Sequence, residues 1–340
     1  MVLIFTNKED AHPNPVIDYL AGWGVPFFRL NTEDLLTEYS FRWSASTKGC
    51  DFEIRNLRNG LGMRGSDITA VWDRRPEPPF SLPVQNTEII NRHIRSEALA
   101  FLRYLRHYLE SIPSIGSIVN DRVASSKMLQ YQVALDCGFV IPDTVFSNDK
   151  NDFISLGGKH PQLCIKGIEG HGVWDEENLQ DYVFYTSIVD SKSLPEIPDE
   201  AFSQTVSFVQ EYVQKAFELR VTVADKDVFA ARIDTQHLDE SKGRIDWRQG
   251  YDSGLRFSEC TLPEDIREKC VLLVHALGLN FGCIDLIVRP DGQYVFLECN
   301  PNGQWLWIEL ETGLKISESI ARFLATQKPY SIWTHSNPGS

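Results

Sequence analysis

Three oxygen-bearing side chains toward the C-terminal end of the chain, Asp285, Glu298 and Asn300, have the spacing of a cation site. They flank the pair Asp291-Gly292, which lies between two runs rich in β-branched and aromatic residues and predicts a hairpin with a two-residue turn. In that register Asp285 lies opposite Glu298, and Asn300 points to the same face. Facing carboxylates repel unless a cation lies between them, and this set of donors suits Mg²⁺. The alternative is a solvent-facing edge hairpin, because a slip of one residue would separate the two acids.

Three arginines, Arg220, Arg232 and Arg248, could point toward the same hairpin. Together with a metal ion, guanidinium groups neutralise the charge that develops on a transferred phosphoryl group. Each arginine taken singly is more typical of a surface salt bridge. A glycine-containing loop from Gly167 to Gly172 follows a predicted strand, and its backbone N–H groups could wrap a polyphosphate. The combination favours a nucleotide site.

The elements that must position these residues are predicted to alternate between strands and helices. The chain opens as a β-α-β unit, with a strand from Val2 to Phe5, a helix from Pro15 to Ala21 and a strand from Pro26 to Arg29. Arg74 and Arg75 follow a later predicted strand end, where α/β domains commonly bind ligands. The alternative for these two arginines is an exposed position before a proline-rich loop.

Length and composition limit the class of protein. A chain of 340 residues is too long for one ordinary core, which predicts two or three domains. The hydrophobic content of 42% is typical of a soluble globular protein, and the net charge of −14 argues against a nucleic-acid partner. We expect a cytoplasmic protein without membrane contact, because there is no basic signal segment and no long apolar run. Seven cysteines without CxxC spacing predict reduced thiols.

A succession of motifs from about residue 118 to residue 325 resembles the ATP-grasp superfamily. These motifs are Lys127, Lys166 with its glycine loop, Gln210-Glu211-Tyr212-Val213, Glu218-Leu219-Arg220, Arg232, Arg248, Asp285 and Glu298-Cys299-Asn300. Two further strings, NPNGQWLWIE from Asn300 to Glu309 and Asp73-Arg74-Arg75-Pro76, resemble the peptide-modifying ligases of the microviridin type, the graspetide synthetases. The alternation of Trp305 and Trp307 with apolar residues is typical of a strand whose side chains mostly pack in a core.

The resemblance implies a mixed α/β (α+β) architecture, the ATP-grasp fold. An N-terminal α/β domain would span residues 1–117. Two α+β subdomains that sandwich ATP would follow, a lid subdomain at 118–208 and a subdomain with the metal site at 209–330. Residues 331–340 would form a tail.

The resemblance also implies the residues that bind the nucleotide, namely Lys127, Lys166, Gly170, Gly172, Gln210, Glu211, Tyr212, Val213 and Glu218. In this assignment the two lysines hold the α- and β-phosphates, and the glycines belong to a loop that closes over them. Glu211 and the backbone of Val213 meet the adenine, and Glu218 meets the ribose. The role of His171 in the loop is left open.

The remaining implied roles concern the metal, the catalysis and the substrate. Asp285, Glu298 and Asn300 would hold Mg²⁺, in agreement with the hairpin register, and Arg220, Arg232 and Arg248 would face the γ-phosphate or an acyl phosphate. The side chains implied to contact an acidic peptide are Arg74, Arg75, Asn302 and Gln304.

The expected activity is ATP-dependent crosslinking of a ribosomally made precursor peptide with a leader and a core. ATP would phosphorylate a side-chain carboxylate of the peptide, and a hydroxyl or amine of the same peptide would attack the acyl phosphate to form an ester or an amide. The resemblance suggests a homodimer. One alternative is a ligase that adds a free amino acid to a small molecule or a protein terminus, as glutathione synthetases and glutamate ligases do. Another is a silent module that only binds a peptide.

Overall fold

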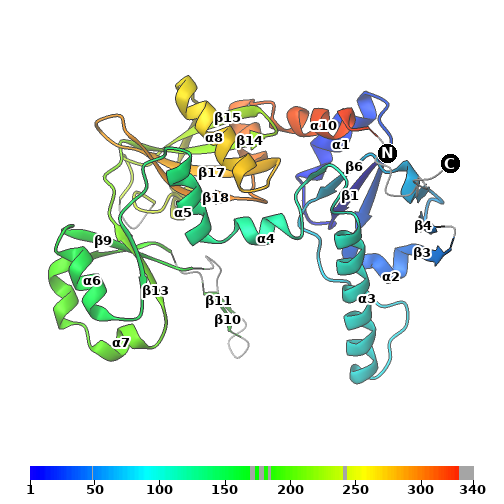
Figure 1. The fold of residues 1–340 in the computed structure, drawn as a ribbon, viewed down its shortest axis with the longest axis horizontal. Coiled ribbons are helices and arrows are strands. Elements are labelled where there is room, and N and C mark those ends of the chain that lie inside the picture. The colour runs from blue at the N-terminus through cyan, green and yellow to red at the C-terminus, as the bar shows by residue number, and fades with distance from the viewer. Residues whose placement is uncertain (48, 169–172, 176–179, 183–184, 240–242, 329–340) are drawn as a thin grey trace.

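The computed structural model of the chain describes residues 1–47, 49–168, 173–175, 180–182, 185–239 and 243–328. Figure 1 shows three bodies in succession along its length, an N-terminal domain, a C-terminal sheet and a smaller lid. No helix among the described residues combines the length and the apolar character needed to cross a membrane. All seven cysteines are free thiols, as predicted.

The N-terminal domain is built on a parallel four-stranded sheet in the order β2-β1-β6-β7. Strand β1 is a run of five fully buried apolar or threonine residues, because helices cover both faces of the sheet. The predicted opening β-α-β unit is confirmed. The domain's elements are β1 (Val2–Thr6), α1 (Pro13–Gly22), β2 (Phe27–Asn31), η1 (Thr32–Asp34), α2 (Leu35–Glu38), β3 (Tyr39–Ser46), β4 (Gly49–Asn56), β5 (Gly62–Arg64), η2 (Gly65–Asp67), β6 (Ala70–Asp73), α3 (Glu88–Tyr108) and β7 (Ser114–Ile115).

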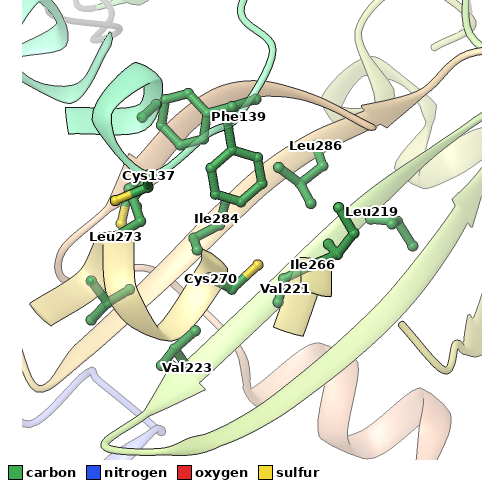
Figure 2. Close-up of a cluster of buried hydrophobic side chains, with 14 of the residues drawn as sticks. Cys137, Phe139, Leu219, Val221, Val223, Ile266, Cys270, Leu273, Ile284 and Leu286 are labelled. Carbon is green, nitrogen blue, oxygen red and sulfur yellow. The ribbon is translucent and has the colours of Figure 1, made fainter. Parts of the chain in front are cut away.

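The C-terminal sheet has five antiparallel strands in the order β16-β15-β14-β17-β18. Helices α5 and α8 cover one face, where Phe139, Leu219, Ile266 and Ile284 pack in a common core, as Figure 2 shows. Helix α10 and the N-terminal domain cover part of the other face. The elements are α4 (Asn120–Ala124), α5 (Lys127–Asp136), β14 (Phe217–Ala224), β15 (Asp227–Asp234), η5 (Trp247–Ser253), β16 (Arg256–Glu259), α8 (Glu264–Ala276), β17 (Phe281–Val288), β18 (Tyr294–Asn300), α9 (Leu306–Thr312) and α10 (Ile316–Thr326).

The lid is an antiparallel sheet in the order β12-β9-β13-β8, with a small core of its own around Phe153, Leu163 and Val209. In Figure 1 it projects from the rest of the molecule below the C-terminal sheet. The elements of this part of the chain are β8 (Thr144–Ser147), α6 (Lys150–Gly157), β9 (Gln162–Lys166), β10 (Val173–Asp175), β11 (Gln180–Tyr182), β12 (Ser187–Asp190), η3 (Ser191–Glu196), α7 (Asp199–Ser203) and β13 (Ser207–Glu211).

The lid begins later than the expected boundary at residue 118. Helix α5 packs against the C-terminal sheet, because Tyr131, Ala134 and Cys137 are buried together with side chains of α8 and β17. The lid sheet starts only with β8. The segment from 118 to about 143 therefore belongs with the C-terminal body, and β13 belongs wholly to the lid although the predicted boundary cut it.

The N-terminal domain and the C-terminal body share a hydrophobic core. Val2, Ile4 and Leu20 from the first pack against Ile316 and Ile320 of α10 in the second, and all five are completely buried. The two bodies are thus distinct segments of the sequence that pack as one layered structure.

Two backbone hydrogen bonds fix the lid where the chain enters it and leaves it. On entry, Phe296 N donates to Val140 O at 2.8 Å, beside an isolated bridge between Val140 and Val295. On exit, Ala216 N donates to Val288 O at 2.8 Å. Both contacts are made to the hairpin of β17 and β18.

That hairpin differs from the predicted one at two places. Arg289 N donates to Gln293 O and Gly292 N to Arg289 O, so the turn has three residues and Gly292 adopts a left-handed conformation with φ of 87°. A β-bulge then shifts the register between Leu286 and Asp285 by one residue. The two differences offset each other, and Asp285 pairs with Glu298 as predicted.

Candidate active site

A cavity of about 770 Å³ lies between the lid, the C-terminal sheet and the carboxyl end of β6. Its wall includes Lys166 and Gln210 from the lid strands, Glu218 from β14, and Arg75 from the N-terminal domain. The side chains predicted to bind nucleotide, metal and substrate therefore converge on it from all three bodies, with exceptions given below.

The floor of the cavity is a row of charged residues across three neighbouring strands. Arg220 of β14 pairs with Asp285 of β17, which pairs in turn with Glu298 of β18. Because successive strand residues alternate between faces, Glu218 and Asn300 share the cavity face with this row. The predicted clustering of Asp285, Glu298 and Asn300 on one face is confirmed.

The two carboxylates are held by cations and by an amide. Arg220 Nη1 donates to both oxygens of Asp285 at 2.8 Å, and Lys127 forms an ion pair with Glu298. Asn300 Nδ2 bridges Asp285 Oδ2 at 3.3 Å and Glu298 Oε1 at 3.2 Å. Burial alone would raise the pKa of Glu298, but the charge and hydrogen bond of Lys127 outweigh it, and the pKa lies below its usual value. The carboxylate is therefore ionised at neutral pH.

This donor set fits Mg²⁺. Two carboxylates and an amide converge on one point, which is the combination that a hard cation takes from a protein when substrate phosphates supply further ligands. The amide oxygen of Asn300 would face the ion after a rotation of the group. Bound Mg²⁺ would neutralise phosphate charge at this floor.

In the lid wall of the cavity, Gln210 carries a buried oxygen without a partner among the described residues. Gln210 is 1% exposed, and its Nε2 donates to Tyr131 Oη and to Thr144 Oγ1, both at 2.9 Å. Its Oε1 has no hydrogen-bond partner among the described residues. A buried acceptor of this kind needs a donor from a ligand, and the exocyclic amine of adenine would supply one. Gln210 therefore fits the predicted nucleobase end.

Glu218 is buried beside the floor and is held by a lysine that the sequence did not single out. Lys215 Nζ donates to Glu218 Oε1 at 2.5 Å and to Ile245 O at 2.9 Å. Burial raises the pKa of Glu218, against the opposing effect of Lys215. Both side chains line the cavity. The predicted contact of Glu218 with a ribose stays a prediction.

Lys166 lines the cavity at the end of β9, and its ammonium group has no hydrogen bond or ion pair with other described residues. Burial lowers the pKa of its ammonium group, which favours binding to an anion that restores a counter-charge. Lys127, at the start of α5, lies on the same wall. Gly170 and Gly172, together with His171, fall outside the described residues.

Arg248 extends into the cavity from the loop before β16. Its guanidinium group is held by Asp246, with Nε to Oδ1 at 2.8 Å and Nη2 to Oδ2 at 2.5 Å. The hydrogen bonds to Asp246 raise the pKa of Arg248, so it is a permanent cation. Trp247, between them in sequence, also lines the cavity and packs against Trp307 with ring centroids 5.4 Å apart.

The prediction that Arg232 faces the site is wrong. Arg232 pairs with Leu219 of β14, one residue out of phase with Arg220, so its side chain lies on the opposite face of the sheet. There it stacks over the ring of Phe217 at 4.0 Å and contacts Asp234 at 3.4 Å. Arg232 follows the order of the predicted site residues in the sequence, but the register of β15 places its side chain on the face of the sheet away from the cavity.

The prediction that Arg74 contacts a substrate is also wrong. Arg74 is 1% exposed, and its guanidinium group donates to Asp10 Oδ2 at 2.9 Å and to Asn302 Oδ1 at 2.7 Å. Asn302 lines the cavity, but its amide nitrogen is occupied by Asp73 O at 3.0 Å and Asp121 Oδ2 at 3.3 Å. Both side chains join the N-terminal domain to the loop after β18.

Arg75 and Gln304 keep the positions expected of substrate contacts. Both are exposed and line the cavity, and the Arg75 side chain has no hydrogen bond or ion pair to other described residues. Arg75 adopts a left-handed backbone conformation with φ of 48°, which turns it away from the buried Arg74. Their contact with a peptide stays a prediction.

The segment expected to be a strand after Gln304 is instead the helix α9. Trp305 is 1% exposed and packs in the core shared with the N-terminal domain, whereas Trp307 lines the cavity. The prediction that most of this string packs in a core holds for Trp305 and Ile308.

Sequence reasoning missed three residues of the site, Tyr131, Lys215 and Asp246. Tyr131 hydrogen-bonds Gln210, Lys215 holds Glu218, and Asp246 holds Arg248. Lys215 lies three residues before its partner and Asp246 two residues before its own, so spacing to a predicted site residue was the available signal. Tyr131 offered no such signal, because 79 residues separate it from Gln210.

Comparison with solved structures shows strong likeness over almost the whole chain, although no family model matches it. The macrocyclase MdnC from Microcystis aeruginosa, solved with the precursor peptide MdnA, is 29% identical with a TM-score of 0.77, covering 95% of this chain and 99% of that one. An ATP-grasp ligase from Chryseobacterium gregarium, described as RiPP-associated and solved with ADP and a leader and core peptide, is 25% identical. It has a TM-score of 0.82 and covers 97% of this chain and 99% of that one.

Two curated proteins match a shorter part of the chain. A tetrahydromethanopterin:α-L-glutamate ligase from Methanocaldococcus jannaschii is 24% identical over 223 residues, which are 64% of this chain and 71% of that protein. A probable α-L-glutamate ligase from Xylella fastidiosa is 29% identical over 212 residues, 59% of this chain and 64% of that protein.

The fold, the charged floor and these likenesses define an ATP-dependent ligase of the ATP-grasp superfamily. The expected architecture and the expectation of an enzyme are thereby confirmed. Within the superfamily, the solved structures that match this chain along the N-terminal domain as well as the other two bodies include macrocyclases and a RiPP-associated ligase.

Proposed function

We propose that this ligase crosslinks side chains of a ribosomally made precursor peptide by forming ester or amide bonds. The observation that carries the proposal is the extent of the match. Structures described as a macrocyclase and as a RiPP-associated ligase match 95% or more of this chain with TM-scores of 0.77 and 0.82 and identities of 29% and 25%. The site supports the proposal as well, because its cavity continues from the charged floor to Arg75 of the N-terminal domain.

The chain's own residues divide the work in this reaction. Gln210 and Glu218 orient the nucleotide, and Lys127 and Lys166 hold its phosphates. Asp285, Glu298 and Asn300 hold Mg²⁺ at the floor. Arg220 and Arg248 face the phosphoryl group as it moves to a peptide carboxylate, where their fixed charges stabilise the transition state. No protein nucleophile is required, because the acyl phosphate of the peptide is itself the activated species.

Arg75 and Gln304 are the proposed contacts for the acidic part of the peptide. The unpaired guanidinium group of Arg75 presents a fork of donors that matches a carboxylate. Arg75→Ala should raise the KM for the peptide by roughly tenfold while leaving the affinity for ATP unchanged.

The experiment that tests the proposal is mass spectrometry of a candidate precursor peptide after incubation with the enzyme, ATP and Mg²⁺. Each crosslink removes the mass of one water from the peptide and releases one ADP and one inorganic phosphate, the latter when the hydroxyl or amine displaces it from the acyl phosphate. A gain of an amino-acid residue when free glutamate is added would instead assign the chain to the glutamate-adding class that the curated relatives represent. Finding neither change with any precursor encoded near the gene would overturn the proposal.

A further inference from the structure

Asp246 contacts two walls of the cavity at once. It is 6% exposed and precedes η5. Both oxygens of its carboxylate hold the guanidinium group of Arg248. The same group accepts a hydrogen bond from the backbone N–H of Thr186 on the lid, with Thr186 N to Asp246 Oδ2 at 3.3 Å. A buried charge is thus placed between the lid and the loop that carries Arg248.

The lid contact leads directly to the phosphate-binding lysine. Thr186 immediately precedes β12, and Ser187 at the start of that strand pairs with Ile165 of β9. The next residue of β9 is Lys166, which ends the strand at the cavity. Asp246 therefore connects the strand pair that carries Lys166 with the loop that carries Arg248.

A second contact fixes the same loop to the floor of the cavity. Lys215 donates both to Glu218 and to Ile245 O, the carbonyl of the residue before Asp246. The loop is thereby held against the floor by Lys215 and against the lid by Asp246. Burial would raise the pKa of Asp246, but its hydrogen bonds with Arg248 outweigh this and lower it, so the carboxylate stays charged across the neutral range.

We infer that Asp246 is a positioning residue that sets the separation of Lys166 and Arg248 across the cavity. The inference deepens the proposed function, since it gives these two cations their roles at the phosphates. A phosphoryl group moving between them is stabilised only if both cations stand at a fixed spacing before the reaction. In this role Asp246 contacts neither nucleotide nor peptide and acts through Arg248 and the lid strand.

The test separates this role from simple capping of η5, to which Asp246 also contributes by accepting from Arg248 N at 3.2 Å. Asp246→Ser keeps a capping oxygen but is too short to hold the arginine and the lid. In the protein without nucleotide, we expect amide hydrogen exchange at residues 186–190 to become roughly tenfold faster in Asp246→Ser. Arg248→Ala keeps the oxygen that accepts from Thr186 N, so exchange in that segment should accelerate less than in Asp246→Ser.

The kinetic arm uses ATP-dependent ADP formation and a double-mutant cycle. Asp246→Ser and Arg248→Ala should each slow turnover, and the loss in the double variant should be smaller than the product of the two single losses, because part of each acts through the same guanidinium group. The matched control is Asp234→Ser, which breaks an aspartate–arginine pair of the same two-residue spacing on the opposite face of the sheet. It should leave both measurements unchanged.

The inference would be overturned if amide exchange at residues 186–190 were as slow in Asp246→Ser as in the wild-type protein. It would also be overturned if the loss of turnover in the double variant equalled the product of the two single losses. The exchange measurement requires no peptide substrate. A failure to crosslink any precursor would therefore remove the proposed function and leave the lid connection standing on its own result.

Discussion

At the scale of single residues, the two carboxylates of the floor differ in how buried their cationic partners are, and therefore in the cost of removing each carboxylate by mutation. Asp285 is paired with Arg220, whose side chain is 7% exposed, whereas Glu298 is paired with Lys127, which is 17% exposed and on a flexible stem. A buried guanidinium group that loses its counter-ion is costly, and a partly exposed ammonium group can turn to solvent.

We therefore expect Asp285→Asn to lower the free energy of unfolding by about 3 kcal/mol and Glu298→Gln to lower it much less. Both should reduce ATP-dependent ADP formation by roughly a hundredfold or more, because each removes a proposed Mg²⁺ ligand. Urea denaturation and a coupled ADP assay measure the two effects. Equal destabilisation by the two variants would contradict the assigned pairing.

Asp121 is the residue with the clearest pH signature. Burial, together with the charge of Asp73, raises its pKa to about 7. The folded state thus binds a proton that the unfolded state releases near its ordinary pKa of about 4. This contribution to stability is complete at low pH and is lost as pH rises through about 7.

The free energy of unfolding of the wild-type protein should accordingly fall by about 1 kcal/mol between pH 6 and pH 8. The Asp121→Asn variant should not show this fall. The carboxylate accepts from Ser117 N and from Asn302 Nδ2 with different oxygens, so the single amide oxygen of asparagine keeps only one of these bonds. The comparison therefore concerns the pH dependence of stability and not its absolute value. Thermal denaturation of both proteins across this range checks the difference. Parallel pH profiles would show that another group titrates there.

At the scale of elements, the loop from Pro301 to Trp305 holds the floor in place through close packing. A Cβ on Gly303 would lie 2.4 Å from Cys283 Cβ and 3.2 Å from Arg220 Nη2. Arg220 Nη2 also donates to Gln304 O at 3.3 Å. The loop therefore lies against both the strand and the arginine that pairs with Asp285.

Gly303→Ala should cost about 1–3 kcal/mol of stability through overpacking, and should slow ADP formation because Arg220 must move. Gly22→Ala is the matched control, since nothing lies within 4 Å of its Cβ and its backbone has no positive φ. Chemical denaturation with an activity assay distinguishes the two. A Gly303→Ala enzyme of normal stability and rate would show that the loop can shift freely.

How far the elements could be predicted is clearest in the hairpin of β17 and β18. The strands, the turn region and the facing of Asp285 and Glu298 followed from residue types, whereas the three-residue turn and the bulge did not. A bulge has no compositional marker, because it depends on how both strands fit the sheet. Arg232 was misplaced for a related reason, since only the pairing of β15 with β14 decides its face.

At the scale of the whole molecule, the shared core predicts which parts unfold together. Ile320 of α10 is fully buried against the N-terminal domain, whereas Phe153 is 1% exposed in the separate core of the lid. Ile320→Ala should cost about 2–5 kcal/mol and speed amide exchange in both β1 and β14. Phe153→Ala should speed exchange in the lid strands alone. Hydrogen exchange followed by mass spectrometry tests this partition, and a uniform change from either variant would contradict it.

The sequence could not show this partition, because the side chains that join the N-terminal domain to α10 are about 300 residues apart and each looks like ordinary core. Periodicity shows that Ile320 is buried and does not show what covers it. The placement of α5 outside the lid escaped prediction for the same reason. The motif residues, in contrast, predicted much of the lining of the cavity, because their chemistry limits where they can lie.

The two backbone anchors of the lid determine how it can move. At the entry, Val140 is fixed beside Val295 and Phe296. At the exit, Ala216 is fixed to Val288, whose partner Tyr294 is the residue before Val295. With entry and exit attached at neighbouring rungs of one hairpin, the lid can turn about the line through the two anchors more easily than it can slide. Gln210 lies two residues nearer the exit along β13 than Phe208, which pairs with Lys166. Such a rotation would therefore displace Lys166 more than Gln210.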